Sequence, residues 1–376
     1  MGGIMKILKI LKGNDDGGVF TCEKQYILSL KKRGIEVYGV IIGQGNSYET
    51  YKDILGKYIE LPEFNASFSG SLKNIYSNIR SAYKYGRKYG ERVFDEFSNS
   101  KFEAIIYRRS SFLFLVGILG KKFDKKVFWH MPNIASSKSS KIFYNIFLRL
   151  FSISPIANSK FTRASLGTFC KHVVYPGYSP ERVSNGVPKY RDSLNISDSA
   201  PLFGVAARIS KDKAQDIVVR AFVESAAFKN GAHLILAGGY DDEDFFANVK
   251  DAAGDNWDKS IHHLGKISDL NNFYASIDVM VNGRINAEPF GISIAESLGA
   301  GVPVIAYNLG GPQEMIEEGR TGWLTQQPTV QQYKEAFNRC YKEKGRWKKM
   351  RVFCIEKAES YTVERNVTNL IDILSY

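Results

Sequence analysis

Short apolar runs alternate with amphipathic stretches along nearly the whole 376-residue chain. The first series opens with MKILKIL (5–11), a helical pattern over 20–33 and EVYGVII (36–42), and a second series begins at PLFGVAA (201–207). Buried parallel strands read as continuous apolar runs, and helices connect them. The pattern therefore predicts an α/β fold with two doubly wound units in sequence. The other runs expected to form strands are EAIIY (103–107), KKVFWH (125–130), SISPIANS (152–159), HVVYP (172–176), HLILAGG (233–239), SIHHLGK (260–266), IDVMVNG (277–283) and PVIAYN (303–308).

The alternation stops once, over residues 177–201. This stretch holds three prolines and many turn formers without sustained periodicity, which predicts a linker. Because ligand loops follow the carboxyl ends of parallel strands, two such units predict a cleft between domains. We expect an N-terminal domain over 1–180, a linker over 181–200, a C-terminal domain over 201–360 and a C-terminal helix over 361–376 that packs on the N-terminal domain.

The charge of the chain is uneven. Residues 1–200 carry 31 Lys and Arg against 16 Asp and Glu, whereas the remainder carries 20 against 23. A basic first half admits a nucleic acid, an anionic membrane or an anionic substrate as its partner. No helix-turn-helix, zinc-finger or RNA-binding sheet pattern occurs, so we expect no nucleic acid.

The four cysteines and the N-terminus bear on location. Cys22, Cys170, Cys340 and Cys354 are scattered without metal-ligand spacing, which favours free thiols in a reducing cytoplasm. The start MGGIMKILKILKG is apolar only briefly and is interrupted by lysines, so we interpret it as a first strand rather than a signal peptide. No apolar run is long enough to predict a spanning helix.

Two glutamates, Glu288 and Glu296, bracket an expected helix start in NAEPFGISIAESLGAGVPV (286–304). Free N–H groups and the helix dipole attract anions there, and Gly291 lets a ligand approach the backbone. Carboxylates accept hydrogen bonds from sugar hydroxyls, so this arrangement suits a nucleotide-sugar. Taken alone, the pair is better explained by Glu288 as a turn residue and Glu296 as part of a solvated helix face.

The stretch NAEPFGISIAESLGAGVPVIAYNLGGPQEMI resembles the C-terminal motif of retaining GT-B glycosyltransferases of glycosyltransferase family 4, with its E-x7-E spacing. Further landmarks of that family follow in order over nearly the whole chain. They are the Gly17-Gly18 turn, IANSKFTRASL (156–166), VVYPGYS (173–179), GVAARISKDKAQDIVVRAF (204–222) and HLILAGGY (233–240). The resemblance implies two Rossmann-like domains facing each other across a cleft, with the donor bound mainly to the second domain and the acceptor to the first.

The resemblance also implies roles for single residues. Arg208 and Lys213 would neutralise the diphosphate, although ARISKDKAQ has Ala207 and Ala214 where the family commonly has glycines. Glu288 would contact the transferred sugar and Glu296 the ribose. Backbone groups would bind the rest of the donor; these candidate residues are Gly17, Gly18, Phe290, Gly291, Ile292, Ser293, Gly265 and Ile267.

His130 ends KKVFWH, and members of the family that the chain resembles have histidine after this strand, so we expect His130 to donate a hydrogen bond to a sugar hydroxyl. The aspartate pairs at 15–16 and 241–242 fit turns better than a metal site. We expect neither a metal nor another cofactor, with a nucleotide-diphosphate sugar as substrate.

The expected function is hexosyl transfer from a UDP-sugar, or GDP-mannose next, to a glycan or lipid-linked acceptor in bacterial surface polysaccharide assembly. Basic, aromatic stretches at 74–94 and 136–153 suit an anionic membrane surface, so the expected location is cytoplasmic, at the inner face of that membrane. The alternatives are a GT-B nucleotide-sugar epimerase, a non-catalytic glycosyltransferase-like binding protein and a peripheral membrane scaffold.

Overall fold

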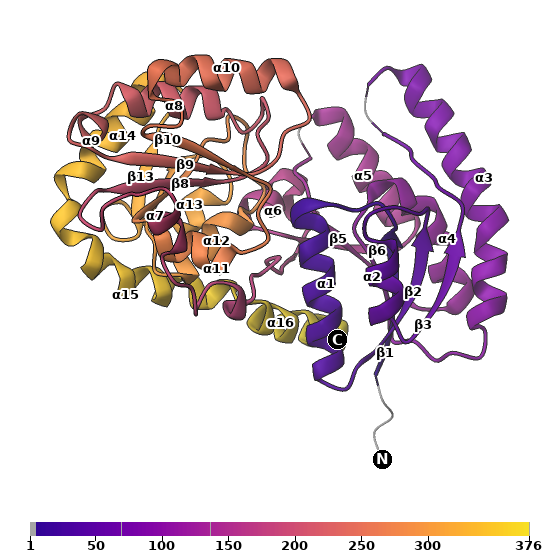
Figure 1. Cartoon of the computed structure of the whole chain (residues 1–376). Coiled ribbons are helices and arrows are strands. Elements are labelled where there is room, and N and C mark those ends of the chain that lie inside the picture. Colours follow the sequence, from indigo (N-terminus) through magenta and orange to yellow (C-terminus); the bar gives the residue numbers. More distant parts are fainter. Residues whose placement is uncertain (1–4, 69, 136, 376) are drawn as a thin grey trace. The chain divides into compact units, whose positions relative to one another are not determined.

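The computed structural model describes residues 5–68, 70–135 and 137–375, and it divides into two compact units (Figure 1). The first unit comprises Met1–Pro176 and Val363–Tyr376, and the second comprises Gly177–Thr362. The start of MGGIMKILKILKG, residues 1–4, lies outside the described residues. Each unit has its own parallel sheet and its own hydrophobic core.

The sheet of the first unit is seven-stranded in the described residues, in the order β3-β2-β1-β4-β5-β6-β7, with every pairing parallel. Five successive residues of β1 are buried, because helices cover both faces of the sheet. The strands are β1 Lys6–Lys12, β2 Glu36–Ile42, β3 Lys57–Leu61, β4 Ala104–Tyr107, β5 Lys126–Met131, β6 Ile153–Ala157 and β7 His172–Val173.

Most helices of the first unit connect these strands, and α3 packs along α4 (Figure 1). Serine hydroxyls accept hydrogen bonds from the backbone at the starts of α3, α5 and α6, as expected for N-caps. The helices are α1 Gly17–Lys32, α2 Tyr48–Ile54, α3 Leu72–Phe97, α4 Leu113–Phe123, α5 Lys138–Leu150, α6 Lys160–Leu166 and α16 Val363–Ser375, with 3₁₀ turns at Ser110–Phe112 and Gly167–Phe169.

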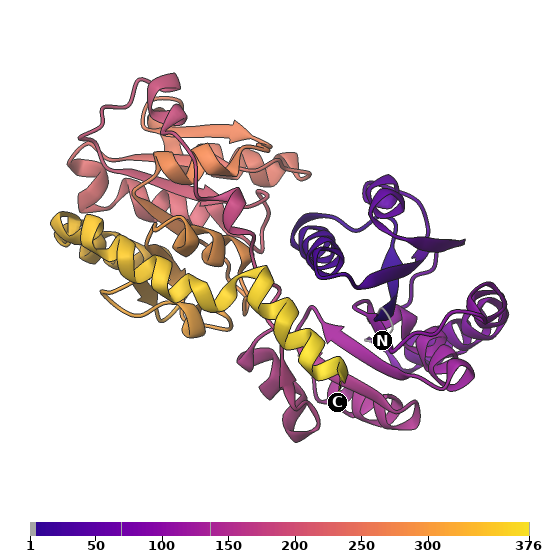
Figure 2. The same ribbon diagram turned by 90° about the horizontal axis from the view of Figure 1, so that it is seen from below.

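The last helix, α16, belongs to the first unit although it ends the sequence (Figure 2). It packs on α1, where Arg33 Nη2 donates a hydrogen bond to the carbonyl oxygen of Glu364 at 2.7 Å. The Asn366 side chain, which is buried, accepts a bond from the Tyr175 N–H at 3.0 Å. These contacts join the C-terminal segment to the end of the first unit's sheet.

The second unit has a six-stranded parallel sheet in the order β10-β9-β8-β11-β12-β13. Residues 181–200 belong to this unit and include α7, which packs against α11. The strands are β8 Leu202–Ala206, β9 His233–Ala237, β10 Ile261–Gly265, β11 Val279–Asn282, β12 Val304–Tyr307 and β13 Gly322–Thr325. The helices are α7 Lys189–Ser193, α8 Gln215–Val223, α9 Ala226–Lys229, α10 Glu243–Ala253, α11 Leu270–Ser276, α12 Ile292–Gly299, α13 Pro312–Met315, α14 Val330–Lys342 and α15 Trp347–Ala358, with 3₁₀ turns at Pro180–Arg182, Gly254–Asn256, Lys344–Arg346 and Glu359–Tyr361.

In both sheets the strand order reverses beside the first strand of the unit, so β1 lies between β2 and β4, and β8 lies between β9 and β11. Open α/β sheets bind ligands at the carboxyl ends of the strands next to such a reversal. In the second unit, the loops that follow β8 and β11 lie next to this point. Those two loops, together with the first turns of α12, carry most of the predicted donor-site residues.

Candidate functional site

Glu288 lies in the loop between β11 and α12, with its backbone fixed on both sides. Its N–H donates to the Leu309 carbonyl at 3.2 Å, and its carbonyl accepts from the Gly311 N–H at 2.7 Å. Its side chain is largely buried, and Oε2 lies 3.2 Å from Lys213 Nζ and 3.3 Å from Arg284 Nη1. Two cations from separate loops therefore hold one oxygen of this carboxylate.

The start of α12 lies directly beyond Glu288. Gly291 precedes the helix with φ of 100°, and a Cβ atom there would lie 2.9 Å from Ile294 Cδ1 and 3.3 Å from Glu288 Cγ. Glycine fits this position for both reasons. The helix's first hydrogen bond runs from the Ile294 N–H to the Gly291 carbonyl, so the N–H groups of Ile292 and Ser293 precede the intrahelical bonds. They form the anion-attracting end that the sequence predicts.

The side chain of Phe290 takes no part in this helix end. It is 2% exposed and faces the ring of Tyr361 with centroids 5.9 Å apart. The Phe290 side chain is therefore packed within the second unit.

Glu296, one turn into α12, is almost fully buried and both of its oxygens face protein groups. Tyr274 Oη lies 3.3 Å from Oε2, and Arg182 Nε lies 3.3 Å from Oε1. Tyr274 also donates to the Ser293 carbonyl at 3.2 Å. Burial raises the pKa of Glu296, and the Arg182 charge and the Tyr274 hydroxyl oppose that rise. A ribose that binds Glu296 must therefore share it with, or displace, the half-exposed Arg182.

The two basic residues expected at a diphosphate have different acidic partners. Arg208 is exposed, and its Nη1 lies 3.0 Å from Asp241 Oδ2, whereas Lys213 is largely buried against Glu288. Lys211 pairs with Asp242 at 3.0 Å on the surface. The structure thus brings Lys213 to the glutamate and leaves the Arg208 head on the surface.

Gly265 ends β10 and Ile267 follows it; both are among the residues expected to bind the donor through their backbone. Gly265 has φ of 65°, and its carbonyl accepts a bond from the Gly238 N–H at 2.8 Å. Ile267 is partly exposed. Because all six strands are parallel, the loops after β8, β9, β10 and β11 lie at the same edge of the sheet. This edge collects every donor-site residue predicted in the second unit.

In the first unit, Gly17 and Gly18 form the exposed start of α1. Gly17 has φ of 52°, and a Cβ there would meet nothing within 4 Å, so its backbone conformation alone favours glycine. Just before them, the Asp15 carboxylate is buried and accepts a bond from Arg109 Nε at 2.8 Å. The turn is thereby joined to the loop that follows β4.

His130 differs from the expectation that it donates to a sugar hydroxyl. It is 1% exposed; its Nδ1 lies 3.0 Å from Arg108 Nη2 and its Nε2 lies 2.8 Å from the Val174 carbonyl. Since Arg108 can only donate, Nδ1 accepts and Nε2 carries the proton. Burial and the Arg108 charge lower the pKa of His130 well below its usual value. As placed, its one N–H is already used within the unit.

Sequence reasoning missed Arg284 and Arg182, which contact the two glutamates, and the buried cluster around His130. In that cluster Glu23 forms ion pairs with both Lys9 and Arg108, and all three side chains are buried. Lysine at the centre of an apolar strand run was the available signal, since a buried lysine needs an acidic partner. Arg182 ends the short 3₁₀ turn Pro180–Arg182 and Arg284 lies in the loop after β11, and the periodicity of the sequence gives no signal at either place.

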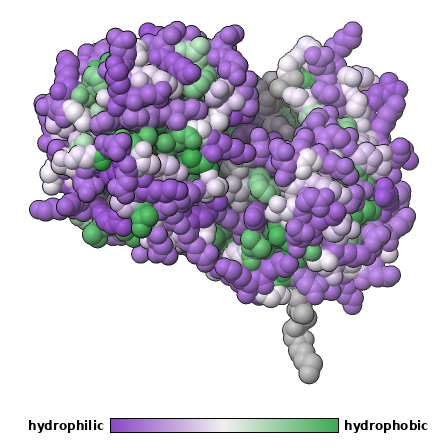
Figure 3. All heavy atoms as spheres, in the orientation of Figure 1, coloured by the Kyte–Doolittle hydropathy of each residue, from purple (hydrophilic) through white to green (hydrophobic). Residues whose placement is uncertain are grey.

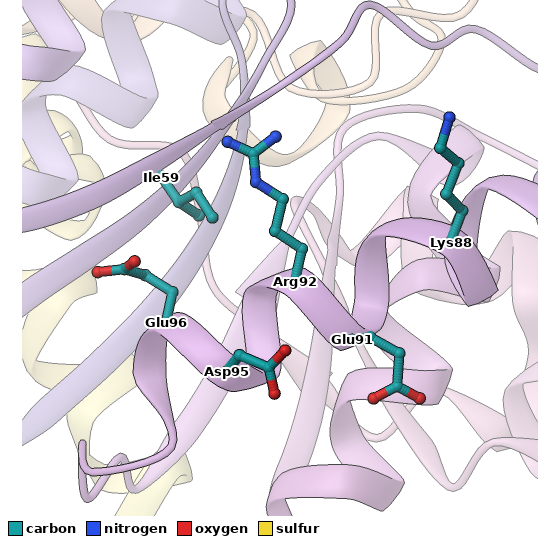
Figure 4. A pocket seen from close by; sticks show the side chains of 6 residues that line it. All are labelled: Ile59, Lys88, Glu91, Arg92, Asp95 and Glu96. Atoms are coloured by element: carbon teal, nitrogen blue, oxygen red, sulfur yellow. The ribbon is translucent and has the colours of Figure 1, made fainter.

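A second kind of site, a charged surface pocket, lies on the first unit at α3 and β3. Two of its carboxylates already have basic partners. Lys57 lies 2.7 Å from Glu96, and Lys122 lies 2.7 Å from Glu91. Figure 4 shows charged side chains along one helix and an apolar one beside them, and the pocket contains no predicted site residue. It is lined by Ile59, Lys88, Glu91, Arg92, Asp95 and Glu96.

The four cysteines are buried with free thiols. Within residues 5–68, 70–135 and 137–375, no group of three or more His, Cys, Asp or Glu side chains is arranged to hold a metal ion. No helix in the same ranges has the length and apolar character needed to cross a membrane.

Known proteins share sequence similarity with this chain. Residues 187–361 match the family model of glycosyl transferases group 1. Sucrose synthase of Denitrovibrio acetiphilus is 30% identical over 194 residues, which cover 45% of this chain and 24% of that protein. The alpha-1,3/1,6-mannosyltransferase of Dictyostelium discoideum is 25% identical over 325 residues, which cover 74% of this chain and 73% of that protein. The chain thus spans about a quarter of the first relative and about three quarters of the second.

Among solved structures, Anabaena HepE in complex with UDP-glucose is similar over its whole length. The TM-score is 0.76 at 19% identity, and the match covers 99% of both chains. At this identity the likeness concerns the fold, and that fold has the two parallel sheets described above. Residues 187–361 therefore form a domain of the glycosyl transferases group 1, and the chain has the GT-B fold of two Rossmann-like domains.

Proposed function

We propose that the protein is a metal-independent, retaining glycosyltransferase of family 4 that moves a hexosyl unit from a nucleotide-diphosphate sugar to a hydroxyl group. A UDP-sugar is the favoured donor and GDP-mannose the next. In the reaction, the bond between the anomeric carbon and the β-phosphate oxygen breaks, and a bond to the acceptor oxygen forms. The acceptor proton passes to the departing phosphate, which leaves as the nucleoside diphosphate.

The observation that carries the proposal is the position of Glu288, which lies between Lys213, Arg284 and the start of α12. A diphosphate placed at the N–H groups of Ile292 and Ser293 would lie near both cations. Preorganised donors and cations matter most where charge develops, which here is the leaving diphosphate. Basic groups and a helix end supply the charge that a metal ion would supply, hence the proposal of a metal-independent enzyme.

In this proposal Glu288 accepts hydrogen bonds from the transferred sugar, and Glu296 accepts them from the ribose. Glu296 is ionised in this role; burial raises its pKa, and the Arg182 charge and the Tyr274 hydroxyl oppose that rise. Gly17 and Gly18 offer backbone N–H groups to the donor. Arg208 would reach the diphosphate by leaving Asp241, its exposed partner. Gly265 and Ile267 remain the candidates for backbone contacts to the base.

A role for His130 requires one change within the first unit. Its Nε2–H must leave the Val174 carbonyl before it can donate to a sugar hydroxyl. We therefore propose His130 as a residue that orients Arg108 and the strand ends, with sugar contact as the alternative.

The proposed acceptor is a glycan or lipid-linked glycan, and the proposed setting is bacterial surface polysaccharide or lipopolysaccharide assembly at the cytoplasmic face of the membrane. The support is the charge of the first 200 residues, with 31 Lys and Arg against 16 Asp and Glu. Such a surface attracts phosphate-bearing lipid acceptors and anionic lipids.

Two other activities compete with this proposal. A nucleotide-sugar epimerase with the same fold would turn over its sugar without an acceptor, and a binding protein would hold the nucleotide without turnover. The contact of Glu288 with Lys213 and Arg284 favours an enzyme over a binding protein, because these cations would stabilise the departing diphosphate. Release of nucleoside diphosphate that depends on added acceptor distinguishes the transferase from both.

The test is a thermal-shift panel with UDP, GDP, dTDP, ADP and their common sugar conjugates. A ligand that binds only the folded state adds about 2.7 kcal/mol at ~100-fold excess over its Kd. We expect one nucleotide series to stabilise the wild type and to stabilise Glu296→Ala much less. Lys348→Ala, an exposed change on α15, is the matched control and should respond like the wild type. No shift from any nucleotide with folded protein would contradict the proposal.

A further inference from the structure

Helix α5 of the first unit exposes an apolar stripe. Ile142, Ile146 and Leu150 are 61%, 56% and 58% exposed, and they recur every fourth residue along one side of the helix. The other side of α5 packs into the core through Phe143 and Leu148, which are buried. The face of the molecule in Figure 3 is mainly hydrophilic, and large aliphatic side chains on such surfaces are usually scattered singly. Three aligned on one helix call for a function.

The stripe borders a shallow groove between α5 and the 3₁₀ turn Gly167–Phe169. Ile142 and Ile146 line it from the helix, and Leu166 and Phe169 line it from the other side. The Arg149 guanidinium lies over the Phe169 ring, 5.3 Å from its centroid. Apolar surface and a cation therefore meet at the same edge of α5.

The surrounding chain is basic. Residues 125–180 contain eight lysines and arginines and no aspartate or glutamate. Lys138 and Arg149 are both exposed, four residues before Ile142 and three after Ile146, which places them beside the stripe. A surface that combines aliphatic side chains with uncompensated positive charge is complementary to phosphate head groups above acyl chains.

We propose that the α5 face, defined as Ile142, Ile146, Leu150, Lys138 and Arg149, docks on the surface of a membrane that contains anionic lipid. The three aliphatic side chains enter the boundary between head groups and acyl chains, and the cations contact lipid phosphates. A lipid surface fits better than a protein partner, because a stable protein interface buries ~800 Å² on each side, more than three aliphatic side chains supply. Shallow insertion has no such requirement.

This inference rests on the proposed function only in that a lipid-linked acceptor would be presented at the docked face. Docking is measured without donor or turnover, and nucleotide binding is measured without lipid. A protein that fails to bind vesicles can still be tested for nucleotide binding, and the reverse also holds. Failure of docking and failure of the transferase proposal are therefore distinguishable.

The test is flotation of the full chain with vesicles of phosphatidylcholine alone or mixed with phosphatidylglycerol, at low and high salt. We expect the wild type to float with the mixed vesicles, less so at high salt, and not with the neutral ones. The variant I142S/I146S/L150S should partition more than about tenfold less, because the inserted apolar surface is lost. K138E/R149E should weaken binding by about fivefold or more for each cation changed.

Matched controls lie on α15 of the second unit. Val352 and Ile355 are 66% and 39% exposed, and Lys348 and Lys349 are exposed. V352S/I355S and K348E/K349E should float like the wild type, and all variants should keep the wild-type melting temperature.

The proposal is overturned if the wild type does not float with anionic vesicles, or if the α5 and α15 variants behave alike. Stripe-dependent dimers on gel filtration, without vesicle binding, would also overturn it and would identify a second copy of this chain as the occupant.

Discussion

Lys213 Nζ lies 3.2 Å from Oε2 of Glu288, although the two residues are 75 positions apart in the sequence. Lys213 follows β8 and Glu288 follows β11, and these strands pair with each other. Their parallel pairing brings the two loops to the same edge of the sheet. The contact therefore joins the basic loop after the unit's first strand to the E-x7-E segment.

Replacing Lys213 tests the role of this contact. K213A removes one of two cations from Glu288 and from the proposed leaving-group site, so we expect kcat to fall by ~10²-fold or more. K211A is the control, because Lys211 is exposed and pairs with Asp242 on the surface. Steady-state rates of nucleoside diphosphate release measure both. Equal losses in the two variants would argue against a specific role for Lys213.

Arg284 is the second cation in contact with Glu288. Replacing it by alanine or by lysine distinguishes the effect of its charge from the effect of its planar shape. R284A should lower kcat by ~10-fold or more, and R284K should recover part of the loss because an ammonium supplies charge without the planar fork. Rates are compared at saturating donor. An R284A enzyme with wild-type kcat would restrict Arg284 to a structural role.

Glu296 should show opposite effects on stability and on binding. Burial raises its folded pKa, so the folded state binds a proton more readily than the unfolded chain, and the ionised form lowers stability above that pKa. E296Q should thus unfold at the same or higher denaturant concentration at neutral pH. Nucleotide affinity should fall ~10-fold or more, because hydrogen bonds to a charged acceptor are lost. Chemical denaturation and calorimetric titration measure the two, and a less stable E296Q that binds nucleotide normally would contradict the argument.

Ala214 adopts a left-handed backbone conformation with φ of 43° at the start of α8. This conformation is unfavourable for a residue with a Cβ atom by ~1–2 kcal/mol. Glycine avoids that cost, although its greater conformational entropy in the unfolded chain offsets part of the gain in stability. A214G should therefore raise the free energy of unfolding by about 1 kcal/mol. A207G is the control, since Ala207 has no positive φ, and it should be neutral or destabilising. Urea unfolding curves compare them, and a destabilised A214G would contradict the strain argument.

His130 predicts acid sensitivity of the fold. Its folded pKa lies well below its usual value, so the folded state resists protonation, and stability is lost as pH falls below the unfolded value near 6.5. H130Q can accept from Arg108 and donate to Val174 without titrating. Between pH 6.5 and 5, the free energy of unfolding of H130Q should fall less steeply than that of the wild type. The two slopes should differ by ~1.4 kcal/mol per pH unit. Parallel pH profiles for the two proteins would contradict this prediction.

The strands were the most predictable part of the fold, because a buried parallel strand needs a continuous apolar run. EVYGVII matches β2 at both ends, and each of the other runs expected to form a strand overlaps one, although β1 and β5 each end one residue beyond the expected run. The strands β3 and β13 were not predicted. Each lies at an edge of its sheet and is short or mixed with polar residues, as in KYIEL (57–61) and GWLT (322–325). The hydrophobic pattern of the sequence does not reveal these two strands, because each is held in place by hydrogen bonds to its one neighbouring strand.

The sequence by itself determined the α/β class, the two units and the helix start at Gly291, because apolar periodicity and backbone requirements are local properties of the chain. Only the tertiary structure decided which charges meet. It paired Lys213 and Arg284 with Glu288, gave Glu296 to Arg182 and Tyr274, and enclosed His130 beside Arg108. The physical reason is that an ion pair depends on distance in space, and loops far apart in sequence meet only when parallel strands bring their carboxyl ends together.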